Sequence, residues 1–199
     1  MCGRFYVDDE MRNEIDKICK KIDQNYHQRA GDIRPSEESL VIRKDSDNEL
    51  CAMPGIWGYQ WKESKKLLIN ARVETIHLRP AFRNDYKYHR CVIPISGFYE
   101  WNREKVQFRC RPLENQKVIY LAGIYSGTDQ GSRFTIITTQ ANEKMRVVHD
   151  RMPVVISEEN LSDWLIGIEI NRKEDGDSFL MERVKKEEYQ QLSFLDGQY

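Results

Sequence analysis

The chain has no long apolar run anywhere in its 199 residues. A membrane-spanning helix needs about 20 consecutive apolar residues, so the sequence does not resemble a helical membrane protein. The start of the chain also lacks the basic segment, apolar segment and cleavage site of a secretory signal. We therefore expect a cytoplasmic protein that makes no contact with a membrane.

A surplus of positive charge is missing as well. The 31 lysine and arginine residues are balanced by 32 aspartate and glutamate residues, and the formal net charge is −1. This balance excludes a globally basic surface, so any nucleic-acid site must be a local patch. Apolar residues make up 40% of the chain, which is enough for the core of one domain.

The spacing of the cysteines is not typical of a disulfide-bonded fold or of a metal site. The five cysteines are Cys2, Cys19, Cys51, Cys91 and Cys110, and no two of them have the C-x-x-C spacing. An odd count without that spacing argues against a disulfide scaffold and against a structural zinc site. We expect a reducing compartment, no bound metal and no other cofactor.

Short apolar runs separated by turn signals predict a fold that is rich in strands. Strands are expected at 39–43, 51–61, 91–95, 98–102, 106–111, 118–125, 134–139 and 153–156. Helices are expected at 8–28, 74–79, 141–148 and 158–165. The pattern predicts one α+β domain over residues 1–199, with a curved, mostly antiparallel sheet or barrel and flanking helices.

Two segments leave alternatives open. Trp57, Tyr59 and Trp61 alternate at period two, which is typical of a core-facing stripe but also fits a platform for stacked bases. The segment 79–90 interleaves three arginines with tyrosine and histidine side chains, and it is either a solvated loop or a loop that contacts phosphate.

The first residues, Met-Cys-Gly-Arg-Phe at 1–5, hold the most unusual chemistry. Initiator methionine is trimmed when the second side chain is small, so we expect Cys2 to become the amino terminus. Its amine, with an ordinary pKa of roughly 7.7–8.0 against about 10.4 for lysine, is then far more often neutral and nucleophilic near pH 7 than a lysine amine. Such an aminothiol condenses with an aldehyde to an imine and closes through sulfur to a thiazolidine ring. The alternative is a small buried apolar residue, since free cysteine is commonly buried and inert.

Four further motifs accompany this start: Asn-Ala-Arg-Val-Glu-Thr at 70–75, Pro-Ile-Ser-Gly-Phe-Tyr-Glu-Trp at 94–101, Thr-Thr-Gln-Ala-Asn at 138–142 and His-Asp-Arg-Met-Pro at 149–153. In this order and at these separations, the five motifs resemble the SRAP (SOS-response-associated peptidase) family over residues 2–165. The resemblance implies a compact domain with a barrel-like β core. It also implies a protein that captures abasic sites in single-stranded DNA as a covalent crosslink.

The resemblance carries roles to four positions of this chain. Cys2 matches the crosslinking residue, and Asn70 matches the asparagine that holds the amino-terminal residue and the sugar by hydrogen bonds. Glu100 matches the active-site carboxylate, and His149 matches the active-site histidine. Imine formation and thiol addition both need proton transfer, which a carboxylate and a histidine can supply near pH 7.

DNA contacts are expected from seven side chains: Arg4, Arg72 and Arg151 for phosphates, Trp57 and Trp101 for stacked bases, and Thr138 and Thr139 for phosphate or else for ordinary cross-strand pairing. Arginine binds phosphate through two parallel hydrogen bonds, without sequence preference. The low net charge predicts a short footprint on DNA. We expect a monomer that associates with the nucleoid when it is bound to DNA.

One departure from the family pattern is Asp32, which stands where the family often has asparagine. The acid either weakens DNA binding or only caps a turn. Three functions stay open on the sequence: a covalent abasic-site sensor, a thiol autopeptidase or peptidase with Cys2 as nucleophile, and a noncovalent module for single-stranded DNA.

Overall fold

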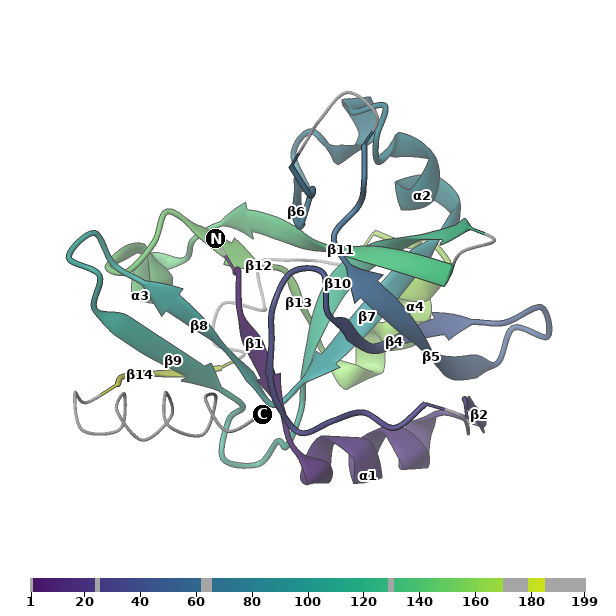
Figure 1. Cartoon of the computed structure of the whole chain (residues 1–199), viewed down its shortest axis with the longest axis horizontal. Helices are drawn as coiled ribbons and strands as arrows, with labels where there is room; N and C mark the ends of the chain where they lie inside the picture. Colours follow the sequence, from purple (N-terminus) through teal and green to yellow (C-terminus); the bar gives the residue numbers. More distant parts are fainter. Residues whose placement is uncertain (1, 24–25, 62–65, 129–130, 170–178, 185–199) are drawn as a thin grey trace.

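The computed structural model describes residues 2–23, 26–61, 66–128, 131–169 and 179–184 (Figure 1). The helical elements are α1 (Asp9–Ile18), η1 (Ile76–Leu78), α2 (Arg83–Tyr88), α3 (Glu143–Arg146), η2 (Glu158–Asn160) and α4 (Leu161–Leu165). The strands are β1 (Phe5–Val7), β2 (Lys21–Ile22), β3 (Gly31–Ile33), β4 (Glu38–Lys44), β5 (Leu50–Trp57), β6 (Asn70–Arg72), β7 (Arg90–Ile95), β8 (Gly97–Trp101), β9 (Gln107–Arg111), β10 (Ile119–Thr128), β11 (Gly131–Gln140), β12 (Arg151–Pro153), β13 (Val155–Ile156) and β14 (Leu180–Arg183). Within the described ranges, no helix combines the length and apolar composition that crossing a bilayer requires.

A ring of strands forms the centre of the molecule. Strands β11, β10, β7, β4 and β5 follow one another through antiparallel pairing. A parallel contact at Phe134 and Trp57 then joins β11 back to β5. Closure of this kind removes the free edges of a sheet. The prediction of an α+β fold with a curved, mostly antiparallel sheet is confirmed.

A second sheet, in the order β14-β9-β8-β1-β3, holds the start of the chain. Strand β1 lies between β8 and β3, with Phe5 opposite both Phe98 and Ile33. Side chains alternate along a strand, so Glu100 points to the same face as Phe98. The chain start and Glu100 therefore meet on the inner side of this sheet.

Trp57 belongs to the core where the ring closes. Its side chain is fully buried, 5.0 Å from the ring of Phe5 and 6.4 Å from that of Phe134. The indole nitrogen donates a hydrogen bond to the carbonyl of Ile69 at 3.0 Å. With no exposed face, Trp57 does not fit the predicted role in base stacking, and the core interpretation describes it instead. Gly58, with a φ of +111°, ends β5 at this point.

Helix α1 is shorter than the expected helix over 8–28. Its start agrees with the prediction, because the Asp8 side chain accepts a hydrogen bond from the amide of Met11 at 3.0 Å and caps the first turn. The helix ends at Ile18, and residues Lys21–Ile22 instead form β2, which pairs with β5. Sheet pairing outweighs the helical pattern beyond that point.

Half of the segment 79–90 is helical, because Arg83–Tyr88 form α2. Arg90 is buried, and its guanidinium lies 4.5 Å from the ring centres of Tyr86 and Trp164. Its charge pairs with Glu169 at 2.9 Å. Neither a solvated loop nor a phosphate-contacting loop describes Arg90, which holds α2 and α4 together by cation–π contacts.

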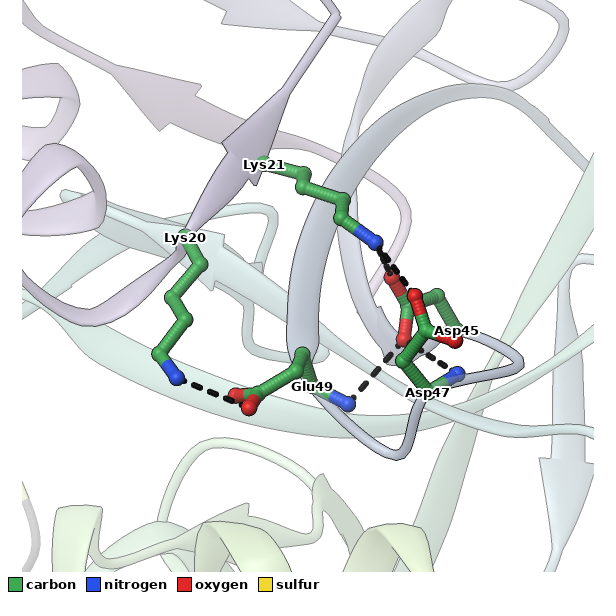
Figure 2. Close-up of polar contacts among 5 residues, drawn as sticks. All are labelled: Lys20, Lys21, Asp45, Asp47 and Glu49. Carbon is green, nitrogen blue, oxygen red and sulfur yellow. Dashed lines mark hydrogen bonds and ion pairs between the residues drawn. The ribbon is translucent and has the colours of Figure 1, made fainter.

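The turn between β4 and β5 is organised by carboxylates (Figure 2). One Asp45 oxygen accepts hydrogen bonds from the amides of Asp47 and Glu49, at 2.9 and 3.0 Å. Lys21 binds the carboxylates of Asp45 and Asp47, while Lys20 binds Glu49 at 2.7 Å. The hydrogen bonds from the two amides hold the chain in the turn that joins the two strands. These exposed pairs fix β2 beside the hairpin but add little stability.

Candidate active site

The start of the chain is tied to strand β6. Cys2 is fully buried, and its carbonyl accepts a hydrogen bond of 2.9 Å from the side-chain amide of Asn70. Asn70 begins β6, which runs parallel to β11. The other side-chain atom of Asn70, Oδ1, is buried and has no hydrogen-bond partner among the described residues. An acceptor is therefore available for a donor bound beside Cys2.

Glu100 brings a buried carboxyl to the same place. The residue is 2% exposed, and burial raises its pKa above the ordinary value of 4.5, against an opposing effect of His149. Burial also raises the pKa of the Cys2 thiol, and Glu100 raises it further. The pKa of the buried Cys110 thiol is raised by burial and, to a smaller extent, by Cys2 and Glu100. These groups form one electrostatically coupled cluster.

His149 reaches the cluster from the segment between α3 and β12. Its backbone amide donates to the carbonyl of Met145 at 2.8 Å, which continues the turn of α3. Its ring nitrogen Nδ1 accepts a hydrogen bond from the backbone amide of Arg151 at 2.9 Å. Because Nδ1 acts as the acceptor, the proton of the neutral ring lies on Nε2. The ring therefore presents an N–H donor on its other side.

Three hollows run past these residues, with volumes of about 440, 570 and 660 Å³. Arg72 lines the first and second hollows, whereas Arg146 and His149 line the second and third. Because neighbouring hollows share these residues, we treat the three together and call them the arginine groove. Their lining also includes Trp61 in the first hollow and Trp101 in the third.

The arginine groove concentrates positive charge on a protein whose net charge is −1. Its basic lining consists of Arg72, Arg79, Arg103, Arg146 and Arg151, against the acids Glu104 and Asp150. Such a local surplus attracts a phosphate backbone without requiring a basic protein. Inside the described ranges, no cluster of three or more His, Cys, Asp or Glu side chains is arranged to hold a metal ion.

Several predicted site residues meet in space. Cys2 contacts Asn70, Cys2 interacts electrostatically with Glu100, and Glu100 does so with His149. Trp101, at the end of β8, is half-buried in the arginine groove. The groove also includes Arg146, which the sequence analysis missed because it stands outside every motif.

Arg4 and Arg151, both predicted phosphate ligands, are held by carboxylates. Arg4 forms an ion pair with Asp32, which lies in β3 opposite Tyr6. Arg151 forms an ion pair with Glu74. Of the three predicted phosphate arginines, Arg72 is the exposed one and it lines the groove.

The two threonines are sheet residues. Thr138 is buried, and its hydroxyl donates to the carbonyl of Ala71 at 3.5 Å. Thr139 lies opposite Met152 in the pairing of β11 with β12. Their positions agree with the alternative of cross-strand pairing, and burial leaves Thr138 no route to phosphate.

Comparison with known proteins gives a consistent result. The sequence model of the family described as SOS response associated peptidase (SRAP) matches residues 1–194. The abasic site processing protein YoqW of Bacillus subtilis is 37% identical over 185 residues, covering 83% of this chain and 80% of that protein. The abasic site processing protein YedK of Escherichia coli is 29% identical over 179 residues, with 83% and 79% covered. A crystal structure of a Bordetella bronchiseptica protein superposes with a TM-score of 0.72 at 23% identity, covering 92% of this chain and all of that one.

Proposed function

The chain belongs to the SOS response associated peptidase (SRAP) family, and on this premise we propose that it traps abasic sites in single-stranded DNA on Cys2. The ring-opened sugar of such a site carries an aldehyde, which an amino-terminal cysteine converts to a thiazolidine. The observation that carries the proposal is the hydrogen bond from Asn70 to the Cys2 carbonyl. It ties Cys2, which interacts electrostatically with Glu100, to Asn70, which lines the arginine groove.

The chemistry begins once Met1 is removed and the Cys2 nitrogen is a primary amine. The amine adds to the aldehyde carbon to give a carbinolamine. Glu100, whose pKa is raised by burial, is suited to give a proton to the departing hydroxyl, so that water leaves and an iminium forms. Asn70 Oδ1 is placed to accept a hydrogen bond from the reacting nitrogen.

In ring closure, Glu100 accepts a proton instead of donating one. The Glu100 carboxylate takes the proton of the Cys2 thiol as the sulfur adds to the iminium carbon. The product is a neutral thiazolidine, Glu100 is again protonated, and one water has been released overall. Because burial raises the pKa of the Cys2 thiol, sulfur stays protonated until this step and the amine attacks first.

The raised thiol pKa also separates this function from peptide cleavage. A cysteine peptidase attacks with a thiolate, which is favoured by nearby positive charge and exposure. Cys2 is instead buried beside a carboxyl, and both features raise the pKa of its thiol. The site therefore favours aldehyde capture over a thiol peptidase.

DNA enters along the arginine groove in this proposal. Arg72 binds backbone phosphate, and Trp101 stacks on a base next to the lesion, which is worth roughly 1–3 kcal/mol per base. The Nε2–H of His149 donates to an oxygen of the sugar or its phosphate. All three contacts are independent of sequence, as a lesion sensor requires.

The test uses single-stranded DNA with one abasic site and a denaturing gel. The parent protein is expected to give a covalently shifted band, Cys2→Ala no band, and Cys2→Ser a weaker or less durable one. Cys51→Ala is the matched control, because Cys51 is also a buried thiol but lies in β5 away from the groove. Its band should equal that of the parent.

Intact mass spectrometry of the same samples first establishes that Met1 has been removed. A durable band of equal strength from Cys2→Ala would refute the proposal. Retention of the band by Cys2→Ser at full strength and durability would refute the thiazolidine. Cleavage of a peptide without DNA would favour the peptidase instead.

A further inference from the structure

Glu74 holds Arg151 with both carboxylate oxygens. The two guanidinium NH groups of Arg151 donate to Oε1 and Oε2 at 2.7 and 2.9 Å. One of them also donates to the carbonyl of Thr138 at 2.8 Å. Two parallel charged hydrogen bonds of this kind fix direction as well as distance. Arg151 is thus clamped at its end, with a side chain that is 13% exposed.

The clamp reaches across a strand. Thr138 of β11 pairs with Arg72 of β6 along one edge and with Pro153 of β12 along the other. Glu74 follows β6 and Arg151 opens β12, so their ion pair spans β11 and ties its two neighbours together. Figure 1 shows the three strands close together in the upper middle of the view, where β6 and β12 both pair with β11. Strand β6 carries Asn70, and the segment before β12 carries His149.

The same arginine sets the state of the histidine. The backbone amide of Arg151 donates to Nδ1 of His149 at 2.9 Å. A shift of the Arg151 backbone would release Nδ1 and allow the proton to move to it. We propose that Glu74 is a positioning residue that acts through Arg151 to keep the Nε2–H of His149 directed at the bound sugar.

DNA affinity alone does not explain Glu74. A carboxylate beside a groove that binds phosphate repels the ligand and cancels one arginine charge. Arg72, by contrast, is exposed in the groove and is available to bind phosphate. Glu74 therefore lowers the affinity for DNA while it holds Arg151 rigidly. This combination is expected of a residue that orients other side chains of the site.

The inference rests on the proposed function for its catalytic readout, and Glu74→Gln tests it. The matched control is Glu49→Gln, because Glu49 is 40% exposed and Glu74 41%, and each is paired with a basic side chain. Glu49 lies in the β4–β5 turn (Figures 1 and 2), far from β12. In parent and control, nitrogen-15 NMR should show His149 protonated at Nε2. In Glu74→Gln the signals should move toward a mixture of both tautomers.

Kinetics give the second readout. At saturating DNA, Glu74→Gln should crosslink roughly ten- to a hundredfold more slowly, since a misplacement of about 1 Å can cost a hundredfold in rate. Its affinity for intact single-stranded DNA should stay equal or rise, because a negative charge has been removed. Arg151→Lys keeps the charge but lacks the planar fork, and it should show the same tautomer mixture.

An unchanged tautomer together with an unchanged rate in Glu74→Gln would overturn the inference, and so would a slower reaction that reaches the parent's rate once DNA is saturating. If the parent forms no adduct, the proposed function fails by itself. The NMR signals of His149 would still decide whether Glu74 orients the ring.

Discussion

Two opposing effects act on the pKa of Glu100. Burial favours the neutral carboxyl group, whereas His149 favours the charged carboxylate. Burial is the larger effect, and the pKa of Glu100 is raised above 4.5. The folded protein therefore binds a proton at this position more tightly than the unfolded chain. The stability gained from that proton is fully present below the unfolded pKa and is lost as pH rises through the folded pKa.

Replacing Glu100 by Gln should remove this pH-dependent loss. Urea unfolding at about pH 4 and about pH 8 should show a smaller fall in the free energy of unfolding than the parent shows. Crosslinking should slow by roughly 10²–10⁴-fold, the usual contribution of a general acid or base. Gln at exposed Glu159 should leave both measurements as in the parent. A parent-like rate in Glu100→Gln would remove Glu100 from the reaction.

At the level of single residues, motif order anticipated which side chains meet but not what each one touches. Cys2 and Asn70 are 68 positions apart and yet share a hydrogen bond. Trp57 shows the limit, because alternation at period two identifies a face without saying whether the core or solvent lies on that side. Arg151 shows another, since the carboxylate of Glu74, which reaches it across β11, determines how much of its charge is available.

Strand β14 is one of the elements that the sequence pattern did not indicate. Residues 180–183 lie in a charged segment that the sequence analysis left unassigned, yet they pair with β9. Phe179, just before the strand, is buried with its ring 5.2 Å from that of Phe98 and nearly perpendicular to it. Phe98 lies two residues before Glu100, so this contact supports the inner face of the site.

Truncating Phe179 to Ala should destabilise the fold by about 3–5 kcal/mol, the usual cost of removing a buried aromatic ring. Chemical denaturation should show a lower midpoint with an unchanged slope. Exposed Glu182 in the same strand is the control, and its alanine variant should stay within about 0.5 kcal/mol of the parent. Equal midpoints for Phe179→Ala and Glu182→Ala would show that β14 adds no stability.

Other elements could be predicted where residues close in sequence determine them, and were missed where distant contacts determine them. The hydrophobic strands of the ring follow the apolar runs, and the cap of α1 follows from Asp8. The end of α1 does not, because β2 depends on pairing with β5, which is distant in sequence. Helix α2 was missed for a similar reason: Arg90 is held by α4, about 75 residues further on, through contacts that no local pattern reveals.

Across the whole molecule, positive and negative charges nearly balance, and the arginine groove is a local surplus of positive charge. With a formal net charge of −1, the protein as a whole does not attract DNA electrostatically. The arginine groove must therefore supply the electrostatic part of binding. The composition alone could predict that any DNA-binding site is confined to a local basic patch. The location of the groove follows only from the fold, which brings Arg72 and Arg146 together from different strands and helices.

Salt dependence measures this distribution directly. For Arg72→Gln, the slope of log affinity against log salt should be smaller by about 0.7, the value for one phosphate contact on a single strand. The control is Lys17→Gln in α1, which removes the same charge on the opposite side of the molecule from β6 (Figure 1). Equal slopes in the parent and Arg72→Gln would exclude Arg72 as a phosphate ligand.

The buried position of Cys2 has a practical corollary for handling the protein. Its side chain is enclosed, and its carbonyl is tethered by Asn70. An affinity tag fused ahead of Met1 would have to emerge from this enclosed corner, and until cleaved it would also convert the amine into an inert amide. If Cys2 forms the crosslink proposed above, preparations tagged in that way would give no adduct, so a recombinant product for that assay should be released with cysteine as its first residue.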